Sequence, residues 1–306
     1  MNKHILGSAV VLLSASCFAT AAIIIKFAYD MDLSVWQVLW FQSFMASMIL
    51  AVIMYVRPRR ASLSWNRFLP LMLQGVVGAF VTSLAFFMSL QFINASLASV
   101  LLYTYPVFVT LGSMLFLKKP VSLRQLLAIL CTVAGTLLVL NIFSVNLTGW
   151  STVGVLLGLL SGITYAFYNV MGEVTLSHHD PFTVTAITQF ASTGALVVIR
   201  PGVTTMLFTG DVEAWFVGAL LAIVTSIVPF FLLLHGIKML GAARSAIIST
   251  FELPMTMLLS FILLEEQINE VQLIGAVLVL FGIIVLQSPS GMKSMLIRKN
   301  KQVGRY

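Results

Sequence analysis

Ten long apolar stretches follow one another along this chain, with short connections between them and no soluble domain. A helix that crosses roughly 30 Å of hydrocarbon has about 17 to 25 residues, and each stretch falls in this range. The sequence therefore predicts an all-α integral membrane protein with ten transmembrane helices. They are expected near residues 5–27, 35–56, 68–91, 95–117, 123–142, 152–175, 183–200, 214–237, 243–264 and 271–288.

The composition supports this fold class. Apolar residues make up 59% of the 306 residues, charged residues only 9%, and the mean hydropathy is +1.04. A soluble domain of this length covers its core with a charged surface, and this chain has too little charge to form one. Ordinary soluble folds are therefore excluded.

The chain also repeats itself at a spacing of about 147 residues. Each copy holds five predicted helices, and an odd number makes the second copy enter the membrane upside down. We expect a first five-helix repeat over residues 1–147, a second, inverted repeat over 148–288 and a basic cytoplasmic tail over 289–306. Inverted repeats are typical of secondary transporters, whose substrate sites lie near the midplane between the halves. The shift superimposes Gly7 on Gly154, Ser14 on Ser161, Gln42 on Gln189, Gln125 on Gln272 and Gly135 on Gly282.

The distribution of basic residues predicts the orientation. If both termini are cytoplasmic, the cytoplasmic segments hold 15 of the 17 Lys and Arg residues, and only Lys26 and Arg200 lie on the other side. This arrangement follows the positive-inside rule. The net charge of +7 then reflects topology and contact with anionic lipid, and we expect no nucleic-acid partner.

Polar groups inside the membrane are costly and usually face an interior cavity. Glu252 is the one acidic residue near the middle of a predicted span. It lies on a single helix face with Ser245, Ser249, Thr256 and Ser260, and Pro254 is expected to kink the helix beside it. We interpret Glu252 as a substrate-site or proton-carrying carboxylate. The alternative is a structural carboxyl bonded to a neighbouring helix.

Two further predicted helices carry polar stripes. In 95–117, Tyr103 and Pro106 lie on a face with Ser96, Ser99, Thr110 and Ser113; in 152–175, Tyr165, Tyr168 and Asn169 share a face with Ser161. Tyrosines and an asparagine can stack on a substrate and bond to it, although tyrosines also face helix bundles without any ligand. Pro229, in 214–237, is a third candidate kink.

These features resemble a known family. Ten helices in a five-plus-five inverted repeat, cytoplasmic termini and the segments Phe251-Glu252-Leu253-Pro254 and Leu264-Glu265-Glu266 are similar to the drug/metabolite transporter superfamily, most closely its EamA-type branch. The resemblance implies a basket-shaped bundle with a central cavity. It also implies alternating access and export of small metabolites, such as amino acids or related amphiphiles, across a bacterial inner membrane.

The candidate substrate residues are therefore Glu252, Tyr103, Tyr165, Tyr168, Asn169, Ser249 and Thr256, with Pro106, Pro229 and Pro254 as candidate kinks in gating. No Lys or Arg lies at mid-depth, so a zwitterionic or cationic substrate is favoured over a strongly anionic one. Protons are a second candidate partner, through Glu252. A carrier that only follows the substrate gradient needs no such coupling.

Other classes of protein remain as alternatives: an intramembrane lipid-modifying enzyme, a receptor or a channel. The short connections and mid-depth stripes argue against an enzyme, and the repeat favours carriers. Cys17 and Cys131 have no metal-site or disulfide spacing, and we see no phosphate-binding loop or zinc signature. We expect neither catalysis nor a metal or cofactor.

Overall fold

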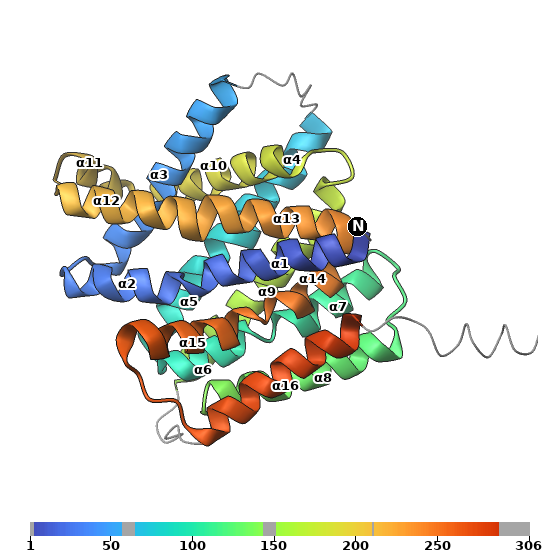
Figure 1. Ribbon diagram of the computed structural model, residues 1–306. Helices are drawn as coiled ribbons and strands as arrows, with labels where there is room; N and C mark the ends of the chain where they lie inside the picture. The colour runs from blue at the N-terminus through green and yellow to red at the C-terminus, as the bar shows by residue number, and fades with distance from the viewer. Residues whose placement is uncertain (1–2, 57–64, 143–150, 210, 288–306) are drawn as a thin grey trace, which may run out of the picture.

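The computed structural model describes residues 3–56, 65–142, 151–209 and 211–287, and the regular elements within these ranges are all helices (Figure 1). The first half contains α1 (Lys3–Ala19), α2 (Ala21–Asp30), α3 (Val35–Val56), α4 (Trp65–Leu73), the π-helix η1 (Gln74–Val81), α5 (Thr82–Ser89), α6 (Ala95–Leu102), α7 (Tyr105–Leu115) and α8 (Leu123–Val139). The second half contains α9 (Thr152–Thr175), α10 (Pro181–Ile199), the 3₁₀-helix η3 (Pro201–Thr205), α11 (Met206–Thr209), α12 (Val212–Leu221), the π-helix η4 (Ala222–Ile227), α13 (Val228–Leu240), α14 (Ala242–Ser249), α15 (Glu252–Leu264) and α16 (Glu270–Gln287).

Nine helical runs in the described residues are long and apolar enough to cross a membrane, and several combine consecutive elements. The remaining predicted stretch forms α8, a shorter apolar helix of 17 residues, or about 26 Å of helix. The predicted all-α membrane fold is therefore confirmed. The nine runs are Lys3–Ile25, Val35–Val56, Trp65–Ser89, Ala95–Leu115, Thr152–Thr175, Pro181–Ile199, Val212–Leu240, Ala242–Leu264 and Glu270–Gln287.

The outside of the bundle is apolar. Large hydrophobic side chains such as Leu13, Phe216, Phe261 and Ile274 are more than half exposed. Exposed apolar area on this scale is unusual for a soluble monomer and suits contact with lipid tails. The largest buried cluster lies among α7, α9 and α13, where Tyr105, Tyr168 and Leu234 are almost fully enclosed.

Helices α8 and α16 pack closely against each other at reciprocal positions (Figure 1). A Cβ added to Gly135 would lie 2.7 Å from the carbonyl oxygen of Gly275, and one added to Gly282 would lie 3.0 Å from that of Ala128. A shift of 147 residues converts Gly135 into Gly282 and Ala128 into Gly275. Gly135, late in α8, meets Gly275, early in α16, whereas Ala128, early in α8, meets Gly282, late in α16. The two helices therefore run antiparallel at this contact.

Interruptions of the spans also fall at this spacing. The π-helix η1 covers Gln74–Val81, and η4 covers Ala222–Ile227, within the range 221–228 that the shift gives. One run is interrupted between α6 and α7, at 103–104, and another between α14 and α15, at 250–251. A wider turn or a break inside a span often marks a functional region.

The connections between the helices gather at two ends of the bundle (Figure 1). We call the N-terminal face the end at which α1 begins, α16 ends and the connections after α7 and α13 lie (Figure 1). Contacts support this grouping, because Gly7 of α1 lies against Leu240, and Gly241 lies beside Lys119. The other end, with the connections after α5 and α15, is called the opposite face.

Candidate functional site

The interrupted spans bring Tyr103 and Glu252 together. Tyr103 ends α6, and Glu252 begins α15, each directly at a break. The Tyr103 hydroxyl lies near the Glu252 carboxyl and interacts with it electrostatically. The carboxylate thus lies in the interior of the bundle, with an aromatic hydroxyl from the other half of the chain beside it.

A continuous row of aromatic rings extends from this pair across the bundle. Successive centroids are 4.7 to 6.3 Å apart, which is within the range of favourable aromatic packing. The row joins α6 and α7 to α9, α13 and α1. Its members in order are Tyr103, Tyr105, Tyr165, Tyr168, Phe230 and Phe18.

Polar atoms without partners lie beside these rings. Asn169 donates from Nδ2 to the Tyr165 carbonyl at 2.8 Å, but its buried Oδ1 has no hydrogen-bond partner. The buried hydroxyls of Ser245 and Ser249 also lack partners of good geometry, although Ser249 lies near the Tyr105 hydroxyl. Buried polar atoms are normally paired. These unpaired groups can therefore form hydrogen bonds with a ligand that enters the bundle.

The remaining predicted residues occupy different surroundings. Tyr168 is only 1% exposed, and its hydroxyl lies near Thr188 of α10. Thr256 lies four residues after Glu252 on α15, on the same side of that helix, and is half-buried.

The three predicted kink prolines each stand at the start of a helical segment. Pro106 is in the first turn of α7 and Pro229 in that of α13, while Pro254 follows the start of α15 by two residues. The first turn tolerates proline because its N–H groups have no partner inside the helix. The kinks therefore coincide with interruptions already present in the spans.

Two buried glutamines bridge helices. The Nε2 of Gln42 donates to the Thr225 and Ser226 hydroxyls at 2.9 and 2.7 Å. Gln74 was not anticipated: its Nε2 donates to the Tyr168 carbonyl at 3.1 Å, and its Oε1 accepts from Thr175 at 2.9 Å. Gln74 thereby fixes the π-helix η1 against α9. An isolated glutamine in an apolar run was its one signal in the sequence.

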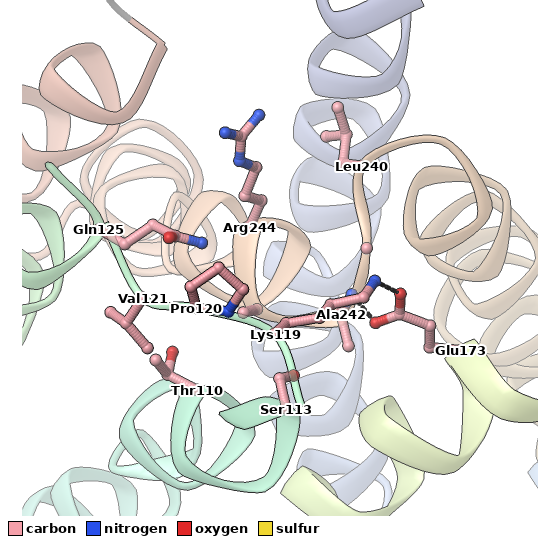
Figure 2. Close-up of a pocket in the computed structure, with 12 residues that line it drawn as sticks. Thr110, Ser113, Lys119, Pro120, Val121, Gln125, Glu173, Leu240, Ala242 and Arg244 are labelled. Carbon is pink, nitrogen blue, oxygen red and sulfur yellow. Dashed lines mark hydrogen bonds and ion pairs between the residues drawn. The ribbon is translucent and has the colours of Figure 1, made fainter. Parts of the chain in front are cut away.

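An ion pair links the two halves at the N-terminal face. Lys119, in the connection after α7, pairs with Glu173 near the end of α9 (Figure 2). Glu173 Oε2 also accepts from the backbone N–H of Ala242 at 2.9 Å. Lys119 is 53% exposed and Glu173 17% exposed. Glu173 was not anticipated, although its repeat equivalent, Lys26, carries the opposite charge.

A cavity of about 230 Å³ lies beside this pair (Figure 2). Its walls come from α7, the connection before α8, and the start of α14. Polar side chains line much of it, among them those of Ser113, Gln125 and Arg244.

The segment His178-His179-Asp180 directly precedes α10. Asp180 accepts from the N–H groups of Phe182 and Thr183 at 3.1 and 3.2 Å, and so acts as the N-cap. Burial lowers the pKa of His179, whose Nε2 is enclosed without a partner. Within the described residues, no group of three or more His, Cys, Asp or Glu is arranged to hold a metal.

Comparisons with known proteins agree with this architecture. A protein of Bacillus subtilis named as an uncharacterized transporter is 28% identical over 88% of this chain and 88% of its own length. An uncharacterized transporter of Synechocystis is 28% identical over 96% of this chain and 98% of its own length. A crystal structure with 14% identity has the same fold, with a TM-score of 0.73 over 92% of this chain and 96% of its own.

The family comparison matches the chain twice. Residues 5–141 and residues 152–287 each match the EamA-like transporter family. The expected resemblance is therefore confirmed, and the protein is a multi-pass membrane protein of the transporter class. This chain belongs to the EamA-like transporter family.

Proposed function

We propose that this protein is a secondary transporter that exports small zwitterionic or cationic metabolites, such as amino acids or related amphiphiles, by alternating access. The observation that carries the proposal is the Glu252–Tyr103 pair at two facing span interruptions, beside a row of aromatic rings. The carboxylate suits a substrate ammonium group. The rings suit an apolar or aromatic side chain and add cation–π attraction.

The topology in this proposal is a ten-helix, five-plus-five inverted repeat, with repeats over 1–147 and 148–288. It is supported by the reciprocal antiparallel contact of α8 and α16, by the equivalent π-helices and by two family matches of similar length. The tenth span would be α8. The predicted tail, 289–306, lies outside the described residues.

We infer that the N-terminal face is cytoplasmic and that the membrane is a bacterial inner membrane. Among the described residues, Lys3, Lys119, Arg124, Lys238 and Arg244 belong to segments at or near this face, as the positive-inside rule requires. The Bacillus and Synechocystis relatives support a bacterial setting.

Alternating access requires each face to open and close in turn. The Lys119–Glu173 pair joins the first half to the second half and, through Ala242, to the helix that leads to Glu252. We propose that this pair holds the cytoplasmic face closed. Its breakage would admit substrate to the central residues.

Counterflow in proteoliposomes tests the function. The assay would use labelled amino acids, polyamines and nucleotide sugars, with wild type, Glu252→Gln and Tyr103→Phe. Glu252→Gln is expected to reduce exchange roughly 10- to 100-fold, because a charged hydrogen bond contributes about 1.5–3 kcal/mol. Tyr103→Phe should reduce it by up to about tenfold. Glu213→Gln, at an exposed acid in the first turn of α12, is the matched control.

The outcomes separate the hypotheses. Exchange of amino acids or amines that is lost in Glu252→Gln and kept in Glu213→Gln supports the proposal. Exchange of nucleotide sugars alone overturns the substrate class. Equal exchange by wild type and Glu252→Gln excludes Glu252 from the site.

Proton coupling through Glu252 is a separate proposal. It is tested by comparing flux with and without an imposed pH gradient. Flux that follows the gradient in wild type, but not in Glu252→Gln, would support coupling. Flux that ignores the gradient in both would identify a facilitator.

A further inference from the structure

The cavity at the N-terminal face is rich in hydrogen-bond donors that have no partner. The Ser113 hydroxyl is 3% exposed, lines the cavity and makes no hydrogen bond. The Gln125 Oε1 accepts from the Ser122 N–H at 2.9 Å, which leaves the amide nitrogen to donate elsewhere. Figure 2 shows this nitrogen directed toward the middle of the cavity.

Arg244 adds a positive charge to the same cavity. Its side chain is half-buried and forms no ion pair within the part of the chain that the structure describes. A guanidinium group offers several N–H donors in a plane and is well matched to carboxylate or phosphate oxygens. Arg244 begins the segment that leads through α14 to Glu252.

The carboxylate of Glu173 in this cavity already has its own partners. Among the described residues that line the cavity, Glu173 is the one acidic residue, and its two oxygens interact with Lys119 and with the Ala242 N–H. No carboxylate therefore remains for Arg244, Gln125 and Ser113. Gln125 and Arg244 lie on one side of the cavity, and Ser113 lies on the side of the Lys119–Glu173 pair (Figure 2).

We propose that this cavity binds an anionic oxygen group, a carboxylate or a phosphate, through Arg244, Gln125 and Ser113. A bound anion also attracts Lys119 and competes with Glu173 for it. Occupation of the cavity thus weakens the pair that joins the two halves of the chain. The inference rests on the proposed function only where the anion is taken to be the carboxylate of a transported solute.

The spacing makes this a site separate from the central one. Arg244 and Glu252 are eight residues apart, about 12 Å along a helix with a rise of 1.5 Å per residue. A small zwitterion does not span this distance. Its carboxylate would be held first at Arg244, and its ammonium group would reach Glu252 only after the solute moves inward.

Thiol labelling measures the anion preference of the cavity directly. Val121 lines the cavity but is none of the proposed donors, so Val121→Cys serves as the probe in a Cys17→Ala/Cys131→Ala background. Anionic sulfonatoethyl methanethiosulfonate is compared with its cationic trimethylammonioethyl analogue. We expect Arg244→Gln to lower the ratio of anionic to cationic labelling rates on the order of tenfold.

Two controls keep this result specific. Arg244→Lys retains the charge and should keep most of the ratio. Lys238→Gln removes an exposed charge at the same face, outside this cavity, and should leave the ratio unchanged. A ratio that is equal in wild type and Arg244→Gln, or that falls equally in Lys238→Gln, would overturn the proposal.

Protection from labelling identifies the source of the anion. In detergent without anionic lipid, isovalerate is compared with isoamylamine, and phosphatidylglycerol vesicles form a third arm. Slower labelling with isovalerate, but not with the amine, assigns the cavity to a soluble carboxylate. Slower labelling with phosphatidylglycerol alone assigns it to a lipid phosphate, and protection by neither contradicts the anion site.

Labelling does not require transport. If counterflow fails while the preference depends on Arg244, the anion site stands without the proposed function. If counterflow depends on Glu252 while the labelling ratio ignores Arg244, the transporter proposal stands without the anion site.

Discussion

The N-terminal face and the opposite face of the bundle have equivalent backbones at positions 147 residues apart. Ser122 and Gln125 cap the start of α8 reciprocally, and Asn269 and Gln272 do the same before α16. The connections before these caps also correspond. Lys118 and Glu265 both have positive φ, at 53° and 55°, and the next N–H bonds back to Ser113 at 3.2 Å or to Ser260 at 3.3 Å.

The charges at these positions are reversed. Lys119 and Glu173 pair at the N-terminal face, and their equivalents at the opposite face are Glu266 and Lys26. Both signs are therefore exchanged between the two sets of equivalent positions. This exchange gives each connection the charge that suits its side of the membrane, because basic residues are favoured in cytoplasmic connections.

The two faces differ in how the neighbouring helix is capped. At the opposite face, Asn94 caps its own helix, α6, by accepting from the Leu97 N–H at 2.8 Å. At the N-terminal face the equivalent residue is Gly241, with φ of 87° and no side chain, and Glu173 accepts from the Ala242 N–H instead. Opening the Lys119–Glu173 pair therefore also disturbs the start of α14. The equivalent change at the opposite face leaves the cap of α6 intact.

Substitutions at the α8–α16 contact test the equivalence of the two halves, and we expect them to have the largest effect on the stability of the protein. Gly135→Leu and Gly282→Leu each force a side chain into backbone of the partner helix. Each should destabilise the protein by about 1–3 kcal/mol or more, measured by thermal unfolding in detergent. Gly194→Leu, at an exposed helix position with open space, is the control and should change little. A large loss in only one of the two variants would contradict their equivalence.

Charge reversal at the N-terminal face should have the next largest effect. Glu173→Lys places two cations together and removes the acceptor for Ala242. We expect counterflow to fall on the order of tenfold, equivalent to about 1.4 kcal/mol in a two-state equilibrium. Lys119→Glu combined with Glu173→Lys should recover part of the activity, since attraction returns but the cap does not. A double variant no better than Glu173→Lys would contradict the pair as a closing contact.

The same reversal at the opposite face should cost less. Glu266 is exposed, so its interactions are screened by solvent, and α6 keeps its Asn94 cap. Glu266→Lys is expected to reduce counterflow only about two- to threefold, in keeping with exposed pairs worth under about 1 kcal/mol. Equal losses for Glu266→Lys and Glu173→Lys would remove the asymmetry inferred from the caps.

Much of the fold was predictable because lipid imposes a simple rule on sequence. The stretch 152–175 coincides with α9, and 95–117 differs from Ala95–Leu115 by two residues at one end. Interruptions were less visible. Pro106, Pro229 and Pro254 indicated kinks, but the π-helix η1 follows from contacts such as that of Gln74 with Tyr168, which local sequence does not encode.

The candidate site was predictable in part for a similar reason. Helical periodicity selected Glu252 and Tyr103, and the structure brings them together. It could not select Phe18 or Phe230, because aromatic residues in an apolar helix are indistinguishable from packing residues until their neighbours are known. Glu173 was missed because its partner, Lys119, lies in a connection 54 residues away in the sequence.

The smallest expected effect is a pH dependence of stability that arises from His179. Burial lowers the pKa of His179 below its ordinary value of 6.5, so the unfolded chain binds more protons than the folded one in the interval between the two values. Stability should therefore rise with pH through this interval, be fully present above about 6.5, and fall under more acidic conditions. His179→Gln should flatten this dependence, whereas exposed His178→Gln should not. Melting temperatures from pH 5 to pH 8 measure the difference. An equal pH slope in wild type and His179→Gln would show that acid sensitivity arises elsewhere, for example among the carboxylates Glu265, Glu266 and Glu270 of the opposite face.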